Sequence, residues 1–237
     1  MDILTGLLAD DAAAPRLTCY DEVTGGRTDL TATTLDNWAA KVANMLHEEF
    51  DLEPGDAAWV DLPVIWPAAC LVLGAARAGV ELSDEDPLAV FAAPADLAGW
   101  EERHPEAVLA AVTDDAFGRG VVECGGEIPP GVVDFGPEVR LHADDYLGPG
   151  PGPDQPLLDG ATAAELMDRA RAAAPAPGAR VLTGGWLDDG RLTAGALVDG
   201  LLAPWAADGS TVVVRGGDAG RRARIAGMEN AAPAGRG

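Results

Sequence analysis

The stretch from Thr31 to Leu82 constrains the fold of this chain more than any other part of the sequence. Apolar residues recur at helical spacing between Leu35 and Phe50, and Thr33 or Thr34 is placed to cap that helix. A turn follows, and then the short apolar run from Ala57 to Leu62 predicts a buried strand. A second helix and a second strand come next. A strand, helix and strand of this length imply a right-handed crossover and a parallel sheet.

The same alternation continues along the chain. The second helix is expected over Val64 to Ala78, with Gly79 at the position after its end, where a left-handed dihedral is needed. Strands are expected at Leu88 to Ala92 and Ala107 to Val112, with a short helix between them. The pattern predicts an α/β fold, doubly wound, with mostly parallel sheets and flanking helices. Further short elements are expected at Ile3 to Leu8 (a helix), Arg16 to Asp21 and Gly26 to Leu30 (a hairpin), and Val132 to Phe135 and Val139 to Leu141 (strands).

A segment rich in Pro and Gly, residues 148–156, is the clearest linker, because alternating Pro and Gly form neither helix nor sheet. It predicts an N-terminal α/β subdomain over residues 1–147 and a second, small α/β subdomain over 157–229. Residues 230–237 are expected to be a disordered tail. The second subdomain is expected to contain helices at Ala161 to Ala174 and Ala194 to Ala207, and strands at Arg180 to Thr183 and Thr211 to Val214.

Several short motifs occur in a familiar order: Leu30-Thr31, Pro54-Gly55-Asp56, Leu62-Pro63 and Gly79-Val80. Over residues 15–87 the chain resembles the N-terminal part of the adenylate-forming superfamily, which includes acyl-CoA synthetases, peptide-synthetase adenylation domains and luciferases. It looks like a truncated, actinobacterial branch of that group. The resemblance implies the N-terminal part of an adenylate-forming-enzyme-like fold, with weaker similarity in the second subdomain.

The resemblance also shows where catalytic groups are missing. Active members carry a Ser/Thr/Gly-rich loop ending in Pro-Lys-Gly that holds the phosphates of ATP. The corresponding stretch here, Gly148 to Gly160, has no Ser, Thr or Lys, and it contains Asp154 and Asp159. Lys41 is the only lysine in the sequence, so the family's C-terminal catalytic lysine has no counterpart. We therefore expect no cofactor, and ATP with Mg²⁺ in particular is not expected.

Two Gly-containing segments are weak candidates for a ligand-binding site. The first follows the predicted strand at Arg180 to Thr183, and the second separates the last predicted strand from a basic helix. The second could hold an anion, but a plain surface loop is the commoner outcome for such a sequence. The candidate residues are Gly184, Gly185, Trp186, Gly216, Gly217 and Arg221. No residue is assigned as catalytic.

Composition excludes several functional classes. There are 39 acidic residues against 16 Lys and Arg, a formal net charge of −23, and a field of this sign repels nucleic acid and anionic membranes. The three cysteines are far apart, which argues against a disulfide framework or a zinc site. The acidic loop at Ser83 to Asp86 and the His142 to Asp145 segment are expected to be solvated and to bind no metal. The N-terminus lacks signal-peptide features, so we expect a cytoplasmic protein.

Three hypotheses about function remain. The first is a non-catalytic, adenylation-domain-like protein that acts as a binding or interaction module. The alternative is an acyl- or nucleotide-binding, ligase-like subunit that needs a partner chain to complete its site and so carries adenylate-forming activity. The third is a structural protein whose exposed apolar patch makes a homo-oligomer. An open sheet edge exposes unpaired backbone groups, so we expect a second copy or a protein partner to cover it.

Overall fold

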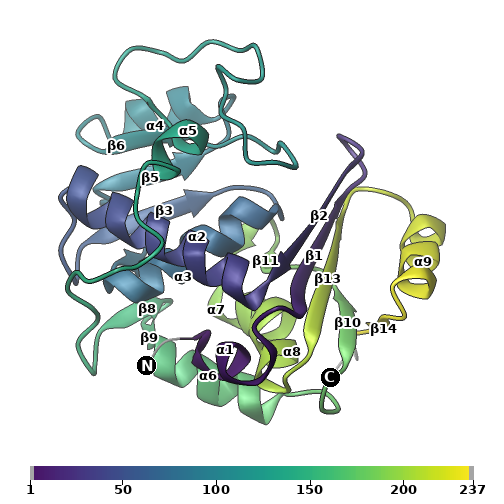
Figure 1. Cartoon of the computed structure of the whole chain (residues 1–237). Coiled ribbons are helices and arrows are strands. Elements are labelled where there is room, and N and C mark those ends of the chain that lie inside the picture. Colours follow the sequence, from purple (N-terminus) through teal and green to yellow (C-terminus); the bar gives the residue numbers. More distant parts are fainter. Residues whose placement is uncertain (1–2, 235–237) are drawn as a thin grey trace. The chain divides into compact units, whose positions relative to one another are not determined.

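The structure is a computed structural model that describes residues 3–234 (Figure 1). The chain forms two compact units. Unit 1 comprises Met1–Thr34, Pro63–Trp66 and Ala163–Gly237, and unit 2 comprises Leu35–Leu62 and Pro67–Thr162. Each unit is built on its own sheet, and both sheets are mostly parallel with flanking helices. The predicted fold class is therefore confirmed.

The sheet of unit 1 has five strands in the order β14-β10-β13-β1-β2. Strand β1 pairs with β2 as the predicted antiparallel hairpin, and it also pairs in parallel with β13, placing Leu17 opposite Thr211. Residues almost 200 positions apart in sequence are thus neighbours in one sheet. The bounds are β1 Pro15–Asp21, β2 Gly26–Thr31, β10 Arg180–Thr183, β13 Ser210–Arg215 and β14 Ala232–Pro233.

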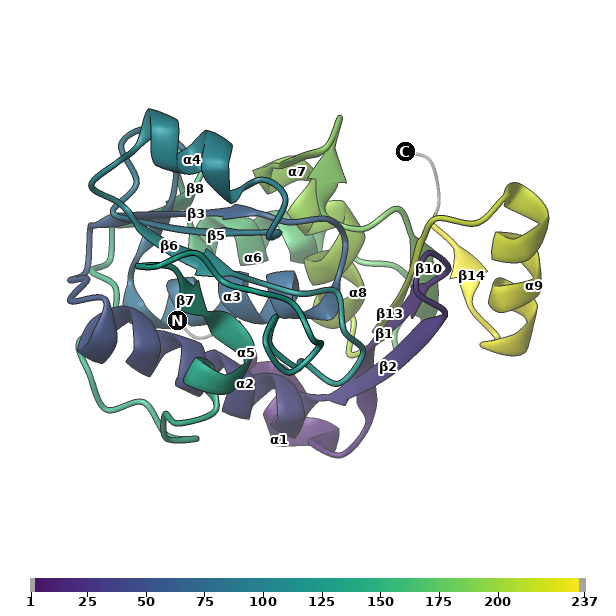
Figure 2. The same cartoon turned by 90° about the horizontal axis from the view of Figure 1, so that it is seen from above.

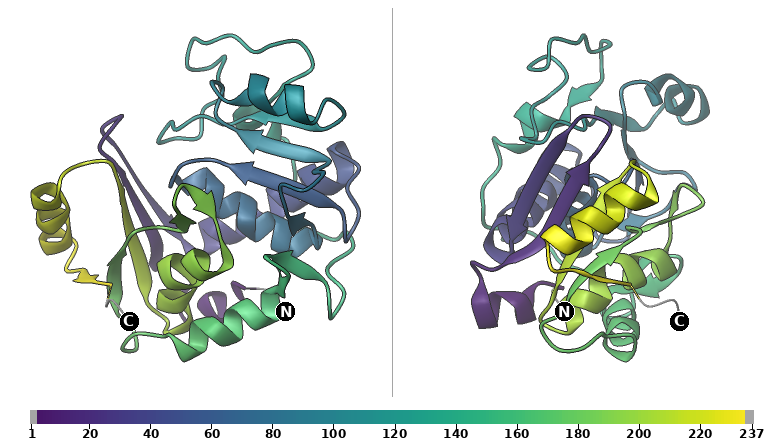
Figure 3. Two further views of the ribbon diagram at one scale, coloured as in Figure 1. Left: turned by 180° about the vertical axis from the view of Figure 1, so that it is seen from behind. Right: turned by 90° about the vertical axis from the view of Figure 1, so that its right-hand side faces the viewer.

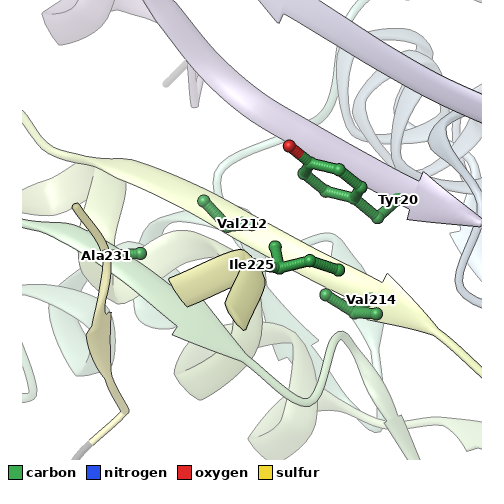
Figure 4. Close-up of a cluster of buried hydrophobic side chains, with 5 residues drawn as sticks. All are labelled: Tyr20, Val212, Val214, Ile225 and Ala231. Atoms are coloured by element: carbon green, nitrogen blue, oxygen red, sulfur yellow. The ribbon is translucent and has the colours of Figure 1, made fainter. Parts of the chain in front are cut away.

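Helices cover both faces of this sheet (Figures 1 and 3). One face carries α9, whose buried Ile225 packs with Tyr20, Val212, Val214 and Ala231 (Figure 4). The opposite face carries the helical segment that contains the buried Leu201. The bounds are α1 Thr5–Asp11, α6 Ala163–Ala172, α7 Ala194–Leu197, the π-helical turn η2 Val198–Leu202, α8 Ala203–Ala206 and α9 Ala219–Met228, with a small hairpin of β11 Leu187–Asp188 and β12 Arg191–Leu192.

The sheet of unit 2 has seven strands in the order β7-β6-β5-β3-β4-β8-β9, all parallel except β9. The interior strand β5 is buried along its whole length, as expected for a strand with helices on both faces. The bounds are β3 Ala57–Asp61, β4 Glu81–Leu82, β5 Ala89–Ala92, β6 Val108–Ala111, β7 Val133–Asp134, β8 Pro156–Leu158 and β9 Ala161–Thr162.

Aromatic packing fixes helices to the sheet of unit 2. The ring of Phe91 on β5 lies 5.8 Å from that of Phe50 and 5.9 Å from that of Phe135. Since these two rings belong to the ends of separate helical segments, both segments meet the same face of the sheet, and α4 lies on the other face (Figure 2). The bounds are α2 Ala32–Asn44, the π-helical turn η1 Met45–Glu49, α3 Trp66–Ala78, α4 Leu97–Arg103 and α5 Phe135–Val139.

Five local predictions were wrong. The helix expected over Ala161 to Ala174 is α6, Ala163–Ala172, and Ala161–Thr162 form strand β9 instead. Helix α2 begins at Ala32, and the hydroxyl of Thr31, not Thr33 or Thr34, accepts the backbone N–H of Thr34 at 3.1 Å. The strand expected at Val139 to Leu141 is replaced by the end of helix α5 and a turn, and only Val133–Asp134 of the preceding strand forms. Pro156, placed in the linker, begins β8 and pairs beside β9. Of the tail, residues 232–233 form β14 against β10, while 235–237 lie outside the described residues.

The predicted subdomain boundary also differs from the division that the structure shows. The hairpin β1–β2 shares a sheet with β13 and β10, so the N-terminal residues join the C-terminal part of the chain. The predicted linker belongs to unit 2, where Gln155 donates through Nε2 to the carbonyl of Gly79. A Pro/Gly-rich composition indicated irregular backbone, but it did not indicate which sheet the flanking strands join.

Candidate functional site

The candidate residues Gly184, Gly185 and Trp186 follow the carboxyl end of β10. The hydroxyl of Thr183 donates to the carbonyl of Gly200 at 2.8 Å and accepts the backbone N–H of Gly185 at 3.2 Å. A Cβ on Gly200 would lie 1.8 Å from the carbonyl oxygen of Gly185, and Gly185 itself has a φ of +88°. The two glycines therefore allow two backbone segments to approach each other closely.

Trp186 is buried at this junction, with 1% of its surface exposed, and its indole Nε1 has no hydrogen-bond partner among the described residues. Gly184 is exposed, and a Cβ there would meet no atom within 4 Å. Gly184 is thus open to solvent, Gly185 is tightly packed, and Trp186 buries an N–H group that has no partner within residues 3–234. Burying an indole N–H without a partner is unfavourable, so the burial of Trp186 carries a desolvation cost.

Gly216 and Gly217 follow the carboxyl end of β13 and both adopt positive φ, +72° and +70°. The carboxylate of Asp218 then caps α9 by accepting the backbone N–H of Arg221 at 2.7 Å. The guanidinium of Arg221 makes two hydrogen bonds to the carboxylate of Glu22, at 2.7 and 2.9 Å. This pairing lowers the pKa of Glu22 and raises the pKa of Arg221. The positive charge that suggested an anion site is thus already neutralised.

The structure brings the two candidate segments to the same edge of one sheet. Strands β10 and β13 are parallel neighbours, with Thr183 opposite Val213. Both glycine segments therefore leave the sheet at its carboxyl edge, where ligands of open α/β sheets commonly bind. The sequence indicated each glycine segment as a candidate site separately. Their closeness depends on β10 and β13 being neighbours in the sheet, which the sequence did not show.

Sequence reasoning missed a charged cluster at the C-terminal end of α9. Glu229, at the end of α9, accepts hydrogen bonds from Tyr20 and Arg180 at 2.5 Å each and from Arg27 at 3.0 Å. Burial acts to raise the pKa of Glu229, but the hydrogen bonds from Tyr20, Arg180 and Arg27 outweigh it and lower the pKa to about 2. Its partners are up to 209 residues away, so no local pattern could have revealed the cluster.

Residues 148–160, which the sequence resemblance matches to the phosphate-binding loop of the adenylate-forming superfamily, are rich in proline in this chain. Residues 149, 151, 153 and 156 are prolines, which have no backbone N–H. The N–H of Gly152 donates to Oε1 of Gln155 at 3.0 Å. A Cβ on Gly79 would lie 2.9 Å from Pro151, which shows how closely this segment packs on unit 2. Asp154 and Asp159 are exposed, and the single lysine, Lys41, pairs with Asp144 at 3.0 Å.

The acidic segments show no metal-binding arrangement. Among residues 3–234, no group of three or more His, Cys, Asp or Glu side chains is arranged to hold a metal ion. In the Ser83 to Asp86 loop, the hydroxyl of Ser83 accepts the backbone N–H of Glu85 at 3.2 Å, which is a local turn contact. A shallow depression of about 260 Å³ lies elsewhere on unit 2, lined by Leu88, Arg103, His104 and neighbouring residues.

Comparison with known proteins agrees with this architecture. The structure is similar to a Brucella canis acyl-CoA synthetase (TM-score 0.75, 17% identity, 98% of this chain and 46% of that one). It is also similar to the acetoacetyl-CoA synthetase of Streptomyces lividans (TM-score 0.70, 18% identity, 97% of this chain and 41% of that one). The fold is thus that of acyl-CoA synthetases, and the chain spans less than half the length of either enzyme.

A sequence relative defines the family more narrowly. A TIGR03089 family protein of Mycobacterium tuberculosis is 34% identical over 228 residues, covering 91% of this chain and 89% of the relative. The chain belongs to the TIGR03089 family. No family model matches the sequence. None of the helices formed by residues 3–234 has the length and apolar character needed to cross a membrane.

Proposed function

We propose that this chain is a non-catalytic, adenylation-domain-like protein that acts as a binding or interaction module and uses neither ATP nor Mg²⁺. The observation that carries the proposal is the fold of residues 148–160. In the superfamily that the sequence resembles, this stretch would grip phosphate. Here it is a proline-rich segment that packs on Gly79 and exposes two carboxylates.

The physical argument concerns donors and charge. A phosphate-binding loop supplies several backbone N–H groups together with a cation. The four prolines remove donors, and Gln155 already accepts the N–H of Gly152. Asp154 and Asp159 would lie beside the phosphates, and two like charges 4 Å apart in water repel by roughly 1 kcal/mol. The net charge of −23 adds long-range repulsion of a polyanion.

The direct test is adenylate formation. The purified chain would be incubated with Mg-ATP, radiolabelled pyrophosphate and a panel of short, branched and long-chain carboxylic acids. An active acyl-CoA synthetase would be the positive control. The proposal expects pyrophosphate exchange at the level of the enzyme-free control for every acid. Exchange that depends on any one acid, and on the amount of the chain added, would refute it.

One observation favours a second candidate, a ligase-like subunit completed by a partner chain. The likeness to acyl-CoA synthetases extends over 97–98% of this chain, and Gly184 remains open at the carboxyl edge of β10. Under this reading a co-purified partner restores acid-dependent exchange to the mixture. Exchange that stays at background with every stable partner would remove this candidate.

Strand β2 supports the proposal of a partner at a sheet edge. It lies at the end of its sheet and is six residues long, whereas the other edge strands among residues 3–234, which are β14, β7, β9, β11 and β12, have two residues each. A long edge strand is a template for pairing with another chain. We propose that a second copy or a protein partner covers it. Sedimentation that shows a monomer at every concentration, with no partner bound in native extracts, would contradict this.

A further inference from the structure

The imidazole of His142 lies between two carboxylates in unit 2. Its Nε2 is 3.1 Å from Oε2 of Glu49, and its Nδ1 is 3.6 Å from Oε2 of Glu48. Only 11% of the histidine side chain is exposed. Both glutamates belong to η1, a π-helical turn at the end of α2. Single π-helical turns within helices are often found at functional positions.

His142 belongs to an irregular segment, residues 140–148, which has no helix or strand of its own. Side chains of α2 attach this segment to the unit. Asn44 donates through Nδ2 to the carbonyls of Ala143 at 3.1 Å and Asp145 at 3.0 Å. Lys41 donates to the carbonyl of His142 and pairs with Asp144 at 3.0 Å. Histidine is the side-chain type whose charge ordinarily changes between about pH 5 and 8, so the contacts of the His142 ring are those through which pH can act on this segment.

We propose that His142, Glu48 and Glu49 form a pH-sensitive clasp that holds the 140–148 segment to η1 more firmly when the imidazole is protonated. A protonated imidazole carries N–H groups on both nitrogens and can face a carboxylate with each of them. A neutral ring has one N–H, so its other nitrogen presents a lone pair to a carboxylate. Hydrogen bonds between ionised partners are also about twice as strong as neutral ones.

The other charged groups near the clasp have partners of their own. His47 of η1 lies 3.9 Å from Oε1 of Glu53 and 3.2 Å from the carbonyl of Leu52 through its Nδ1. Lys41 contacts the backbone carbonyl of His142 and its charge is offset by Asp144. On the same segment, Arg140 pairs with Glu123 at 2.7 Å. Tyr146 has a raised pKa because of burial and the nearby carboxylates of Glu53 and Glu48, so it stays neutral when the imidazole titrates. Glu48 and Glu49 are therefore the carboxylates that face the ring.

The clasp has a mechanical consequence further along the chain. The hydroxyl of Tyr146 donates to the carbonyl of Pro149 at 2.7 Å, and Gly148 lies directly against its ring. The proline-rich segment of residues 148–156 continues from there to its contact with Gly79. Loosening residues 140–148, which Asn44 and Lys41 continue to hold, weakens the attachment at one end of the proline-rich segment. The inference is independent of whether the chain is catalytic.

Hydrogen–deuterium exchange of the full chain tests the clasp. Exchange would be measured at pH 5.5 and pH 8.0, and protection factors would be corrected for the intrinsic pH dependence of amide exchange. We expect the amides of residues 143–148 to be at least threefold more protected at pH 5.5. In His142→Gln, whose amide does not titrate, that difference is expected to disappear. His104→Gln, a histidine that stacks on Trp100 elsewhere in unit 2, is the matched control and should keep it.

Three results decide the matter. Equal protection at both pH values in the unaltered chain overturns the proposal, and so does the same pH difference in His142→Gln. If His142→Gln also lowers the protection of β5, and the unit is thus destabilised, Glu49→Gln replaces it. That variant keeps the imidazole but removes the nearest charge, and it should lower protection at pH 5.5 more than at pH 8.0. No loss of protection in Glu49→Gln would likewise overturn the clasp.

Discussion

Glu229 offers the sharpest test of how unit 1 is held together. Its carboxylate accepts hydrogen bonds from Tyr20, Arg180 and Arg27, and only 12% of its side chain is exposed. The pKa falls from an ordinary 4.5 to about 2, a difference of about 2.5 units. At 1.36 kcal/mol for each unit, the ionised carboxylate stabilises the folded unit by up to about 3 kcal/mol.

The sign of the pH dependence follows from the lowered pKa. The folded state holds its proton less tightly than the unfolded chain, so the stabilisation is fully present above pH 4.5. It is lost progressively as the pH falls from about 4.5 to about 2. Glu229→Gln removes the charge at every pH. The variant is therefore expected to be less stable than the unaltered chain by about 2–3 kcal/mol at pH 7, with the difference shrinking toward zero near pH 2.

The assay is urea denaturation followed by far-UV circular dichroism at several pH values between 2 and 7. Glu127→Gln, an exposed glutamate in an irregular segment, is the matched control and should change the free energy of unfolding by less than 0.5 kcal/mol at any pH. The reasoning is refuted if Glu229→Gln matches the unaltered chain at pH 7. A stability difference that stays constant between pH 5 and pH 2 would also contradict it.

Three further substitutions test the packing. Gly200→Ala places a Cβ 1.8 Å from a backbone oxygen and should destabilise unit 1 by about 3 kcal/mol or more in urea denaturation, whereas Gly184→Ala, with open space around it, should change stability by under 0.5 kcal/mol. Arg16→Met removes a buried guanidinium that donates to the carbonyls of Asp208 and Gly209, in the turn after α8. We expect the free energy of unfolding to fall by about 2–3 kcal/mol. The same change at the exposed Arg222 should have almost no effect on stability. Thr31→Ala removes the N-terminal cap of α2. It should lower the free energy of unfolding by about 1 kcal/mol and lower the thermal midpoint accordingly.

Local sequence patterns predicted most of the secondary structure. The helical spacing from Leu35 to Phe50 predicted α2 and η1, and the positive φ of Gly79, +74°, matches its predicted place after α3. These features depend on residues within a few turns of one another, so a single sequence contains the information. The motif order over residues 15–87 also led to the correct fold class, that of acyl-CoA synthetases.

Long-range pairing was beyond such patterns. Nothing local indicates that Leu17 lies opposite Thr211, and this pairing decides that the N-terminal hairpin belongs with the C-terminal strands. The cluster around Glu229 was missed for the same reason, because its partners are far away in the sequence. The β14 strand was missed because its Ala232 and Pro233 have low strand propensity, and its pairing with β10 stabilises it instead.

The candidate site could be predicted only in pieces. The glycine segments at Gly184 and Gly216 were identified from sequence, but their position at one edge of the sheet depends on β10 and β13 being neighbours. The ion pair of Arg221 was also hidden, because its partner Glu22 is 199 residues away in the sequence. A basic residue near a glycine loop therefore indicates an anion site only when no carboxylate reaches it first.

The most direct test of the proposed function is calorimetric titration of the purified chain with Mg-ATP, followed by a non-hydrolysable acyl-adenosine mimic. We expect no saturable heat with Mg-ATP, because residues 148–160 offer prolines and exposed carboxylates where phosphate would have to bind. Saturable binding of the mimic alone would indicate a surviving acyl or adenosine pocket and favour the partner-completed subunit. Saturable, stoichiometric binding of Mg-ATP would contradict the central claim.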